Sequence, residues 1–188
     1  MEALSIAELG ILDWIAQHCR TAWMDVLMPA ITHLGDKGYI WIALGIVILL
    51  FCKGERATGA QVLLALILSL VICNMILKNA VDRIRPCDLK PVTDLLIHRP
   101  HDPSFPSGHT TASFAAAVVL ILNKWKGRWA ALVLAVVIAF SRLYLYVHFP
   151  TDVLGGVLVG AFCAWLSVTL WRKWIGKVKP FSLLDQRR

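Results

Sequence analysis

Residues 57–77 read ATGAQVLLALILSLVICNMIL, a stretch of about 21 residues without a charged side chain. A helix of about 20 apolar residues is long enough to cross the roughly 30 Å hydrocarbon core of a bilayer. The stretch follows Lys53-Gly54-Glu55-Arg56 and ends at Lys78, so charged residues mark both of its ends. It therefore predicts a membrane-spanning helix and places the chain among membrane proteins.

The composition of the whole chain supports the same class. Of the 188 residues, 58% are hydrophobic and 16% are charged, and the mean hydropathy is +0.67. These values exceed what a soluble domain of this size needs. A net charge of +7 could indicate nucleic acid, but the Lys and Arg residues lie between apolar segments rather than along one face. We interpret them as an orientation signal and expect no nucleic-acid partner.

Four further apolar segments predict spans, at residues 39–52, 109–123, 129–147 and 151–171. In the last of them, Gly156 and Gly160 are spaced for close packing against another helix. The predicted fold is all-α, a polytopic transmembrane bundle of about five to six spans. It forms a single domain over residues 1–188, with a transmembrane core at 38–175 and a basic tail at 176–188.

Residues 1–37 are predicted to form interfacial helices. Residues 4–17 carry an apolar stripe, and Ser5 with Glu8 three positions later has the spacing of a capping box. The segment is too polar to span, so we expect it to lie in the membrane interface. For residues 22–34 the sequence leaves three placements open: spanning, lying in the interface, or packing on the bundle over the site.

The orientation follows from the distribution of positive residues. Eleven of the 19 Lys and Arg residues fall on one side of the predicted bundle and eight on the other. Three of those eight, Lys78, Arg85 and Arg142, are candidate site residues in the polar clusters described next. The positive-inside rule then places the C-terminus in the cytoplasm. The polar loop 79–106, with its five prolines, lies on the opposite, extracytoplasmic face.

The first polar cluster runs from Lys78 to Pro86, KNAVDRIRP. If the helix continues past Lys78, Arg85 returns to the same face after two turns. Two cations on one face near a membrane surface make an anion site. A snorkelling lysine beside a juxtamembrane arginine would give the same pattern.

The second cluster is PSGH, residues 106–109. Ser107 is placed to cap the next helix, and Gly108 leaves the first N–H groups of that helix open to an anion. Helix N-termini favour phosphate because of these free donors and the helix dipole. His109 lies at the rim. Taken alone, the motif is also compatible with ordinary helix capping.

The third cluster is SRLYLYVHFPTD, residues 141–152. Arg142 has the planar guanidinium that suits bidentate contact with phosphate. Pro150 is predicted to open the last helix, so that Asp152 in its first turn reaches back to His148. A carboxylate on one ring nitrogen makes the other nitrogen the better nucleophile. The alternative is a purely structural His–Asp hydrogen bond.

Together, three cations, a helix N-terminus and two histidines on one membrane face fit a phosphoester site. Such a site uses protein cations where other enzymes use Mg²⁺. The five cysteines are scattered without a CxxC pair, and no carboxylate cluster indicates a metal. We expect neither a metal nor another cofactor.

Over residues 78–152 the chain resembles the type 2 phosphatidic acid phosphatase superfamily, whose site the vanadium haloperoxidases share. The three clusters match the family's KxxxxxxRP, PSGH and SRxxxxxHxxxD motifs position by position. The resemblance implies a membrane-embedded phosphatase that holds the phosphate with Lys78, Arg85, Ser107, Gly108 and Arg142.

The resemblance also implies three catalytic residues. His148 would attack phosphorus and become phosphohistidine, Asp152 would orient His148, and His109 would protonate the leaving oxygen. Water would then release inorganic phosphate. Of the residues near these motifs, we expect Asp82, Arg83 and Arg99 to be solvated, with Arg83 able to assist at a second phosphate. Asp102 and Phe105 are expected to shape the entrance.

The predicted function is hydrolysis of a phosphate monoester or diphosphate of a lipid. The resemblance to small bacterial members favours undecaprenyl diphosphate as substrate, in a bacterial plasma membrane with the site on the extracytoplasmic face. Phosphatidate, phosphatidylglycerophosphate and lipid A phosphate are alternative substrates. A non-catalytic protein that binds or transports lipid phosphates is the alternative class. The sequence gives neither the lipid preference nor the oligomeric state.

Overall fold

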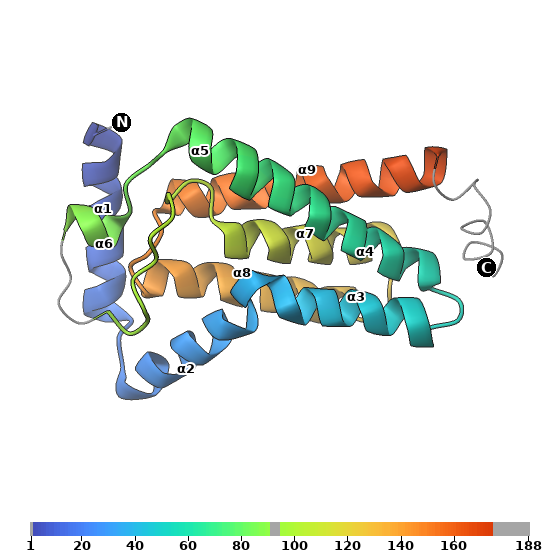
Figure 1. The fold of residues 1–188 in the computed structure, drawn as a ribbon. Coiled ribbons are helices and arrows are strands. Elements are labelled where there is room, and N and C mark those ends of the chain that lie inside the picture. Colours follow the sequence, from blue (N-terminus) through green and yellow to red (C-terminus); the bar gives the residue numbers. More distant parts are fainter. Residues whose placement is uncertain (1, 91–94, 175–188) are drawn as a thin grey trace.

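The computed structural model describes residues 2–90 and 95–174, and within them every regular element is helical (Figure 1). The basic tail predicted at residues 176–188 lies outside the described part. The elements in chain order are α1 Glu2–His18, α2 Ala22–Leu34, η1 Asp36–Gly38, α3 Tyr39–Phe51, α4 Arg56–Ser69, the π-helix η2 Leu70–Leu77, α5 Lys78–Val81, α6 Pro86–Leu89, α7 Gly108–Leu122, α8 Arg128–Tyr144 and α9 Pro150–Lys173.

Helix α7 lies in the middle of the bundle and packs against α4, α8 and α9 (Figure 1). Small residues permit this, since Ala115, Ala116 and Ala117 are fully buried on α7. On α9, a Cβ added to Gly160 would lie 2.5 Å from the Thr111 carbonyl oxygen, and one added to Gly156 would lie 2.9 Å from the Ser107 carbonyl oxygen. The predicted close-packing face of the last helix is therefore confirmed.

The interior and the exterior of the bundle are both those of a membrane protein. Inside, polar side chains bond between helices: Trp41 Nε1 donates to Ser113 Oγ at 2.9 Å, and Asn123 Nδ2 donates to Gln61 Oε1 at 2.6 Å. Outside, α3, α4, α8 and α9 expose large apolar side chains, which suit a lipid environment better than water. These exposed residues include Val47, Leu50, Phe51, Ile67, Val133, Val136, Leu158, Phe162 and Trp165.

By length and composition, two helical stretches of the described chain are able to cross a membrane, Arg56–Leu89 and α9. A third candidate arises if α2 and the segment Asp36–Phe51, which are bent by 42° at their junction, form one broken span. Helix α7 is apolar but shorter. The prediction of membrane-spanning helices is thus confirmed, while five to six spans is a finer statement than these lengths support.

Several helix boundaries differ from the predicted ones. The run that starts at Arg56 stays helical through the π-helix and α5 to Val81, four residues beyond the predicted end at Leu77. The span predicted to reach Val147 ends at Tyr144, because Tyr146 adopts a left-handed backbone with φ 59°. The loop 79–106 is not wholly irregular, since it contains α6.

The N-terminal helices close one end of the bundle, where α1 crosses the ends of the longer helices (Figure 1). Leu12 and Ile15 of α1 are buried, as the predicted apolar stripe requires. The predicted capping box is wrong, because the helix begins before Ser5, and both Ser5 and Glu8 point inward to Arg83. Once Glu8 is buried, leaving its charge without Arg83 would cost more than the gain of about 1 kcal/mol from a helix cap.

Helix α2 packs on the bundle, since its Met28 shares a buried cluster with Tyr144 of α8. It ends at Gly35, and the tight turn η1 then leads directly into α3. Packing on the bundle, one of the three placements left open for residues 22–34, is therefore observed, and it is compatible with α2 forming the first part of a broken span with Asp36–Phe51.

Candidate active site

Lys78 and Arg85 converge on one carboxylate. Lys78 is paired with Asp102 Oδ2, while Arg85 Nη2 donates to Asp102 Oδ1 at 2.9 Å and its Nε donates to the Asp102 carbonyl at 2.8 Å. The predicted route to this meeting is wrong. The helix ends at Val81, Asp82 turns left-handed with φ 44°, and Arg85 is extended just before α6. The chain thus folds back, and the two cations meet through a turn rather than on one helical face.

The carboxylate of Asp102 is strongly held by these two cations. Partial burial raises the pKa of Asp102, but the hydrogen bond from Lys78 and the charges of Lys78 and Arg85 outweigh it and lower the pKa to about 2. Asp102 therefore stays ionised at any physiological pH. Lys78 and Arg85 are buried, whereas the Asp102 carboxylate that pairs with both of them is about half exposed.

Arg142, in the last turn of α8, is a buried cation whose hydrogen-bond donors are not all used. Its Nη1 donates to Thr32 Oγ1 at 2.5 Å, and its Nε has no hydrogen-bond partner. Within residues 2–90 and 95–174 no carboxylate forms an ion pair with it. A buried guanidinium with an unused donor and no paired carboxylate is suited to bind an anion.

The start of α7 is built as predicted. Ser107 is the N-cap residue, and its Oγ accepts hydrogen bonds from the Thr110 backbone N–H at 3.4 Å and the Thr110 hydroxyl at 2.9 Å. Gly108 lines the central cavity. His109 follows, and its Nε2 lies 2.9 Å from Asp36 Oδ1.

His148 and Asp152 meet at the start of α9, which Pro150 opens as predicted. The direct distance from His148 Nδ1 to Asp152 Oδ2 is 3.6 Å, too long for a good hydrogen bond. Ser104 lies between them: its hydroxyl donates to Asp152 Oδ2 at 2.5 Å and lies 3.5 Å from His148 Nδ1. The predicted contact between His148 and Asp152 therefore runs through Ser104, a residue that the sequence did not predict.

The two ring nitrogens of His148 have different neighbours. Nδ1 faces Ser104 and Asp152, whereas Nε2 lies 3.1 Å from the donor Arg85 Nη1. We infer from these partners that the proton sits on Nδ1 and the lone pair on Nε2. Burial lowers the pKa of His148 well below its usual 6.5, and the positive charges of Arg85 and Arg142 lower it further.

Arg83 is not solvated as predicted but forms the centre of a buried network. Its Nη1 donates to Asp152 Oδ1 at 2.7 Å, its Nη2 donates to Glu8 Oε2 at 2.6 Å, and its guanidinium stacks 4.0 Å above the Phe149 ring. Glu8 also accepts from the Thr151 backbone N–H at 2.7 Å. The local sequence did not distinguish Glu8 from Asp13, the other carboxylate beside the apolar stripe of α1. By contrast, Asp82 is exposed, and Arg99 is partly exposed and paired with Asp88.

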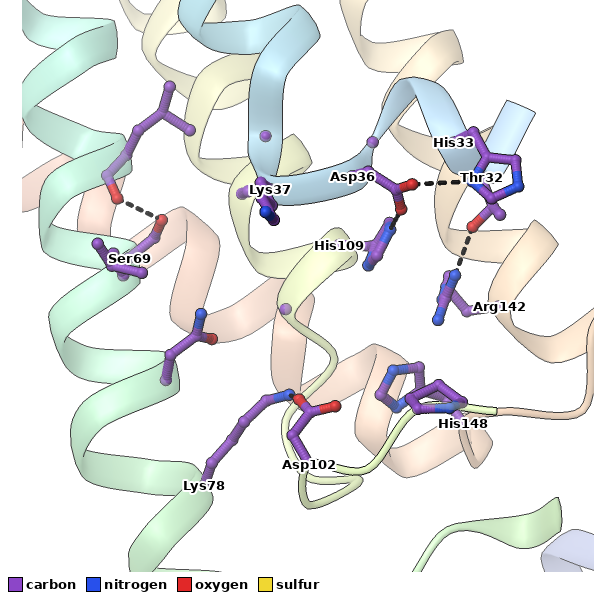
Figure 2. A pocket seen from close by; sticks show the side chains of 18 of the residues that line it. Thr32, His33, Asp36, Lys37, Ser69, Lys78, Asp102, His109, Arg142 and His148 are labelled. Carbon is purple, nitrogen blue, oxygen red and sulfur yellow. Dashed lines mark hydrogen bonds and ion pairs between the residues drawn. The ribbon is translucent and has the colours of Figure 1, made fainter. Parts of the chain in front are cut away.

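One cavity of about 950 Å³ unites the predicted residues (Figure 2). Its polar end is lined by Lys78, Arg85, Asp102, Gly108, His109, Arg142 and His148. Its apolar wall comes from α3, α4 and the first residue of η2, with Ile42, Leu63, Leu66, Ile67 and Leu70. Ser107 and Asp152 are buried behind this lining. The described residues contain no group of three or more His, Cys, Asp or Glu side chains that could hold a metal ion.

Chemically, the cavity joins a cationic end with a neutral histidine to an apolar wall. The cations and the helix N-terminus suit a phosphate, the unprotonated Nε2 suits a nucleophile, and the wall suits a hydrocarbon chain. An amphiphile with a phosphate head fits both ends of this cavity.

Comparison with known proteins gives the same result. The family model of the PAP2 superfamily matches residues 58–175. The undecaprenyl-diphosphatase of Sulfolobus acidocaldarius is 32% identical over 150 residues, which cover 79% of this chain and 71% of that protein.

Two solved structures share the fold. The crystal structure of Aquifex aeolicus LpxE superimposes with a TM-score of 0.75 at 31% identity, covering 86% of this chain and 94% of that one. A transmembrane PAP2-type phosphatidylglycerolphosphate phosphatase from Bacillus subtilis gives a TM-score of 0.73 at 29% identity, covering 96% and 90%. With more than half of its length matched by the family model, the chain belongs to the PAP2 superfamily and is an integral membrane lipid phosphatase.

Proposed function

We propose that the protein hydrolyses undecaprenyl diphosphate to undecaprenyl phosphate and inorganic phosphate through a phosphohistidine at His148. The observation that carries this proposal is a cavity in which the unprotonated Nε2 of His148, three cations and an apolar wall meet. The relative from Sulfolobus acidocaldarius, named as an undecaprenyl-diphosphatase, supports the choice of lipid.

In the first step, Lys78, Arg85 and Arg142 bind the oxygens of the terminal phosphate, with Ser107 and the Gly108 N–H completing the cradle. His148 Nε2 attacks phosphorus while the bond to the leaving oxygen breaks, and His109 gives that oxygen its proton. The imidazolium that forms on His148 keeps its Nδ1 proton towards Ser104 and Asp152, whose negative charge stabilises it.

In the second step, water attacks the phosphohistidine. His109, now unprotonated, accepts a proton from the water, the N–P bond breaks, and inorganic phosphate leaves. His148 returns to its neutral form and His109 is again protonated. The cycle balances without a metal because the three protein cations neutralise the phosphate charge throughout.

The membrane topology is also proposed. Five spans are proposed, at α3, the α4–α5 run, α7, α8 and α9. The start of α7, the end of α8 and the segment before α9, which carry polar lining residues of the cavity, lie at the end of the bundle that α1 closes (Figure 1). The α3–α4 turn with Lys53 and Arg56 lies at the opposite end, as does the end of α9. The positive-inside rule then supports a cytoplasmic C-terminus and an extracytoplasmic site in a bacterial plasma membrane.

A substrate panel tests this function. Purified protein is assayed for phosphate release from undecaprenyl diphosphate, phosphatidate, phosphatidylglycerophosphate and lipid A, with and without EDTA. We expect the highest kcat/KM for undecaprenyl diphosphate, no loss with EDTA, and inhibition by orthovanadate. A higher kcat/KM for another lipid would correct the substrate and leave the mechanism standing. Release from none of them would favour a binding or transport protein.

A further inference from the structure

The turn between α2 and α3, residues 32–38, forms one wall of the cavity although it lies outside the region matched by the family model. We call it the α2–α3 turn. Lys37 with φ 49° and Gly38 with φ 71° are both left-handed, which makes the reversal tight. Gly35 makes the close approach possible, because a Cβ at that position would lie 2.9 Å from His109 Cδ2.

This turn contacts two residues of the proposed machinery. Thr32 Oγ1 accepts a hydrogen bond from Arg142 Nη1 at 2.5 Å, and Asp36 Oδ1 lies 2.9 Å from His109 Nε2. The other Asp36 oxygen lies 2.8 Å from Nδ1 of the exposed His33. In Figure 2, Asp36 sits on one side of the His109 ring, and the opposite side of the ring faces the space above Lys78 and His148.

The charges around His109 indicate what its contact with Asp36 does. Of the charged side chains that act most on its ring, Arg142 and Lys78 are positive and Asp36 is negative. A carboxylate bonded to Nε2–H fixes the tautomer and the ring orientation, and it stabilises the imidazolium needed to donate a proton. The nitrogen left to face the cavity is Nδ1.

We propose that Asp36 is a positioning residue for His109: it holds Nε2–H, so that Nδ1 presents the transferable proton to the leaving oxygen of the substrate. This rests on the proposed role of His109 as the acid. The α2–α3 turn thereby completes the site from a part of the chain that carries none of the family's motifs.

The dependence on the leaving group tests this directly. An alkyl phosphate expels a strongly basic alkoxide and needs a proton, whereas p-nitrophenyl phosphate expels a weakly basic phenolate and needs little help. We compare full-length D36N with wild type on a long-chain alkyl phosphate and on p-nitrophenyl phosphate. Because general acids contribute about 10²–10⁴-fold, we expect kcat/KM, which reports only the steps up to formation of the phosphohistidine, to fall about tenfold or more for the alkyl phosphate and by less than about twofold for the aryl phosphate.

Three further variants make the result decisive. D25N removes a carboxylate of α2, one that accepts hydrogen bonds from Arg20 and Tyr144 and does not line the cavity, and should show no such dependence. G35A, whose new methyl displaces the His109 ring, should reproduce the D36N pattern even if D36N folds poorly. H109A should show the same pattern more strongly. Equal losses of D36N on both substrates, or no loss, would overturn the role of Asp36. A pattern missing in H109A as well would overturn the proposed acid itself.

Discussion

Each of the two histidines of the site faces a carboxylate, but the two pairs are built differently. His148 and Asp152 are four residues apart, and their side chains are 2% and 0% exposed. His109 and Asp36 are 73 residues apart, and their side chains are 20% and 45% exposed. Asp152 is further fixed by Ser104, the Phe149 N–H and Arg83. Asp36 has only the exposed His33 as its second side-chain partner among the described residues.

This difference matches what each pair is proposed to do. A nucleophile that forms a covalent bond benefits from a dry, rigid setting in which its lone pair stays aimed at phosphorus. An acid that must regain a proton in every cycle benefits from access to water. The buried pair therefore should matter for every substrate, and the half-exposed pair chiefly for substrates with poor leaving groups.

The largest expected effect comes from His148→Ala. Without the nucleophile, phosphate release from alkyl and aryl phosphates alike should fall to background, since no leaving group relieves the need for attack. His18→Ala, which removes an exposed histidine far from the cavity, is the control and should retain turnover. Near-normal hydrolysis by folded His148→Ala would show that His148 is not the nucleophile, and the two histidine pairs would then not differ as proposed.

Asp152→Asn should have the next largest effect. The variant keeps the shape of the side chain but loses the charge that faces His148, and we expect kcat to fall about a hundredfold or more. The loss should be equal for alkyl and aryl phosphates, unlike that of D36N. A loss confined to alkyl phosphates would mean that the two pairs do not differ in role.

Arg83→Gln should act mainly on stability. It leaves Glu8 and Asp152 as buried carboxylates without their cation, which costs about 3 kcal/mol. Thermal unfolding in detergent should show a lower Tm. Adding Glu8→Gln should recover part of the loss, because one of the two unpaired charges is then removed. An unchanged Tm would show that the network does not anchor α1 to the site.

The smallest expected effect is that of mild acid. Because burial and the charges of Arg85 and Arg142 lower the pKa of His148 well below 6.5, the ring stays neutral and able to attack as the pH falls to 6.5. The value of kcat/KM, corrected for the ionisation of the phosphate, should fall by less than about twofold between about pH 7.5 and 6.5. A larger fall caused by one group of the enzyme would show that the buried pair titrates like an exposed one.

The sequence predicted the parts of the fold and site that local patterns encode. The apolar stretch 57–77, the Ser107 cap and the Pro150 helix start are all observed, because each depends on neighbours within a few residues. Lys78 and Arg85 were expected to meet along a helix, whereas they meet through a left-handed turn at Asp82. The meeting of these two residues was predicted correctly, whereas the backbone conformation between them was not.

Local sequence patterns did not predict the polar contacts between residues far apart in the chain. Glu8, Arg83 and Asp36 occur in segments whose local sequence is equally compatible with solvated charges. A buried charge is stable only with its partner, and that partner lies many residues away in another element. Ser104 was missed for a similar reason, since a serine in a loop becomes informative only once the residues on both sides of it are known.

The most direct measurement locates the phosphate on the enzyme. Protein turning over a substrate labelled in its terminal phosphate is quenched within milliseconds in alkaline detergent, and the labelled peptide is identified. The two-step mechanism predicts an acid-labile, base-stable label on His148, absent from His148→Ala and present in His109→Ala supplied with p-nitrophenyl phosphate. Label on another residue, or equal labelling of His148→Ala, would contradict it.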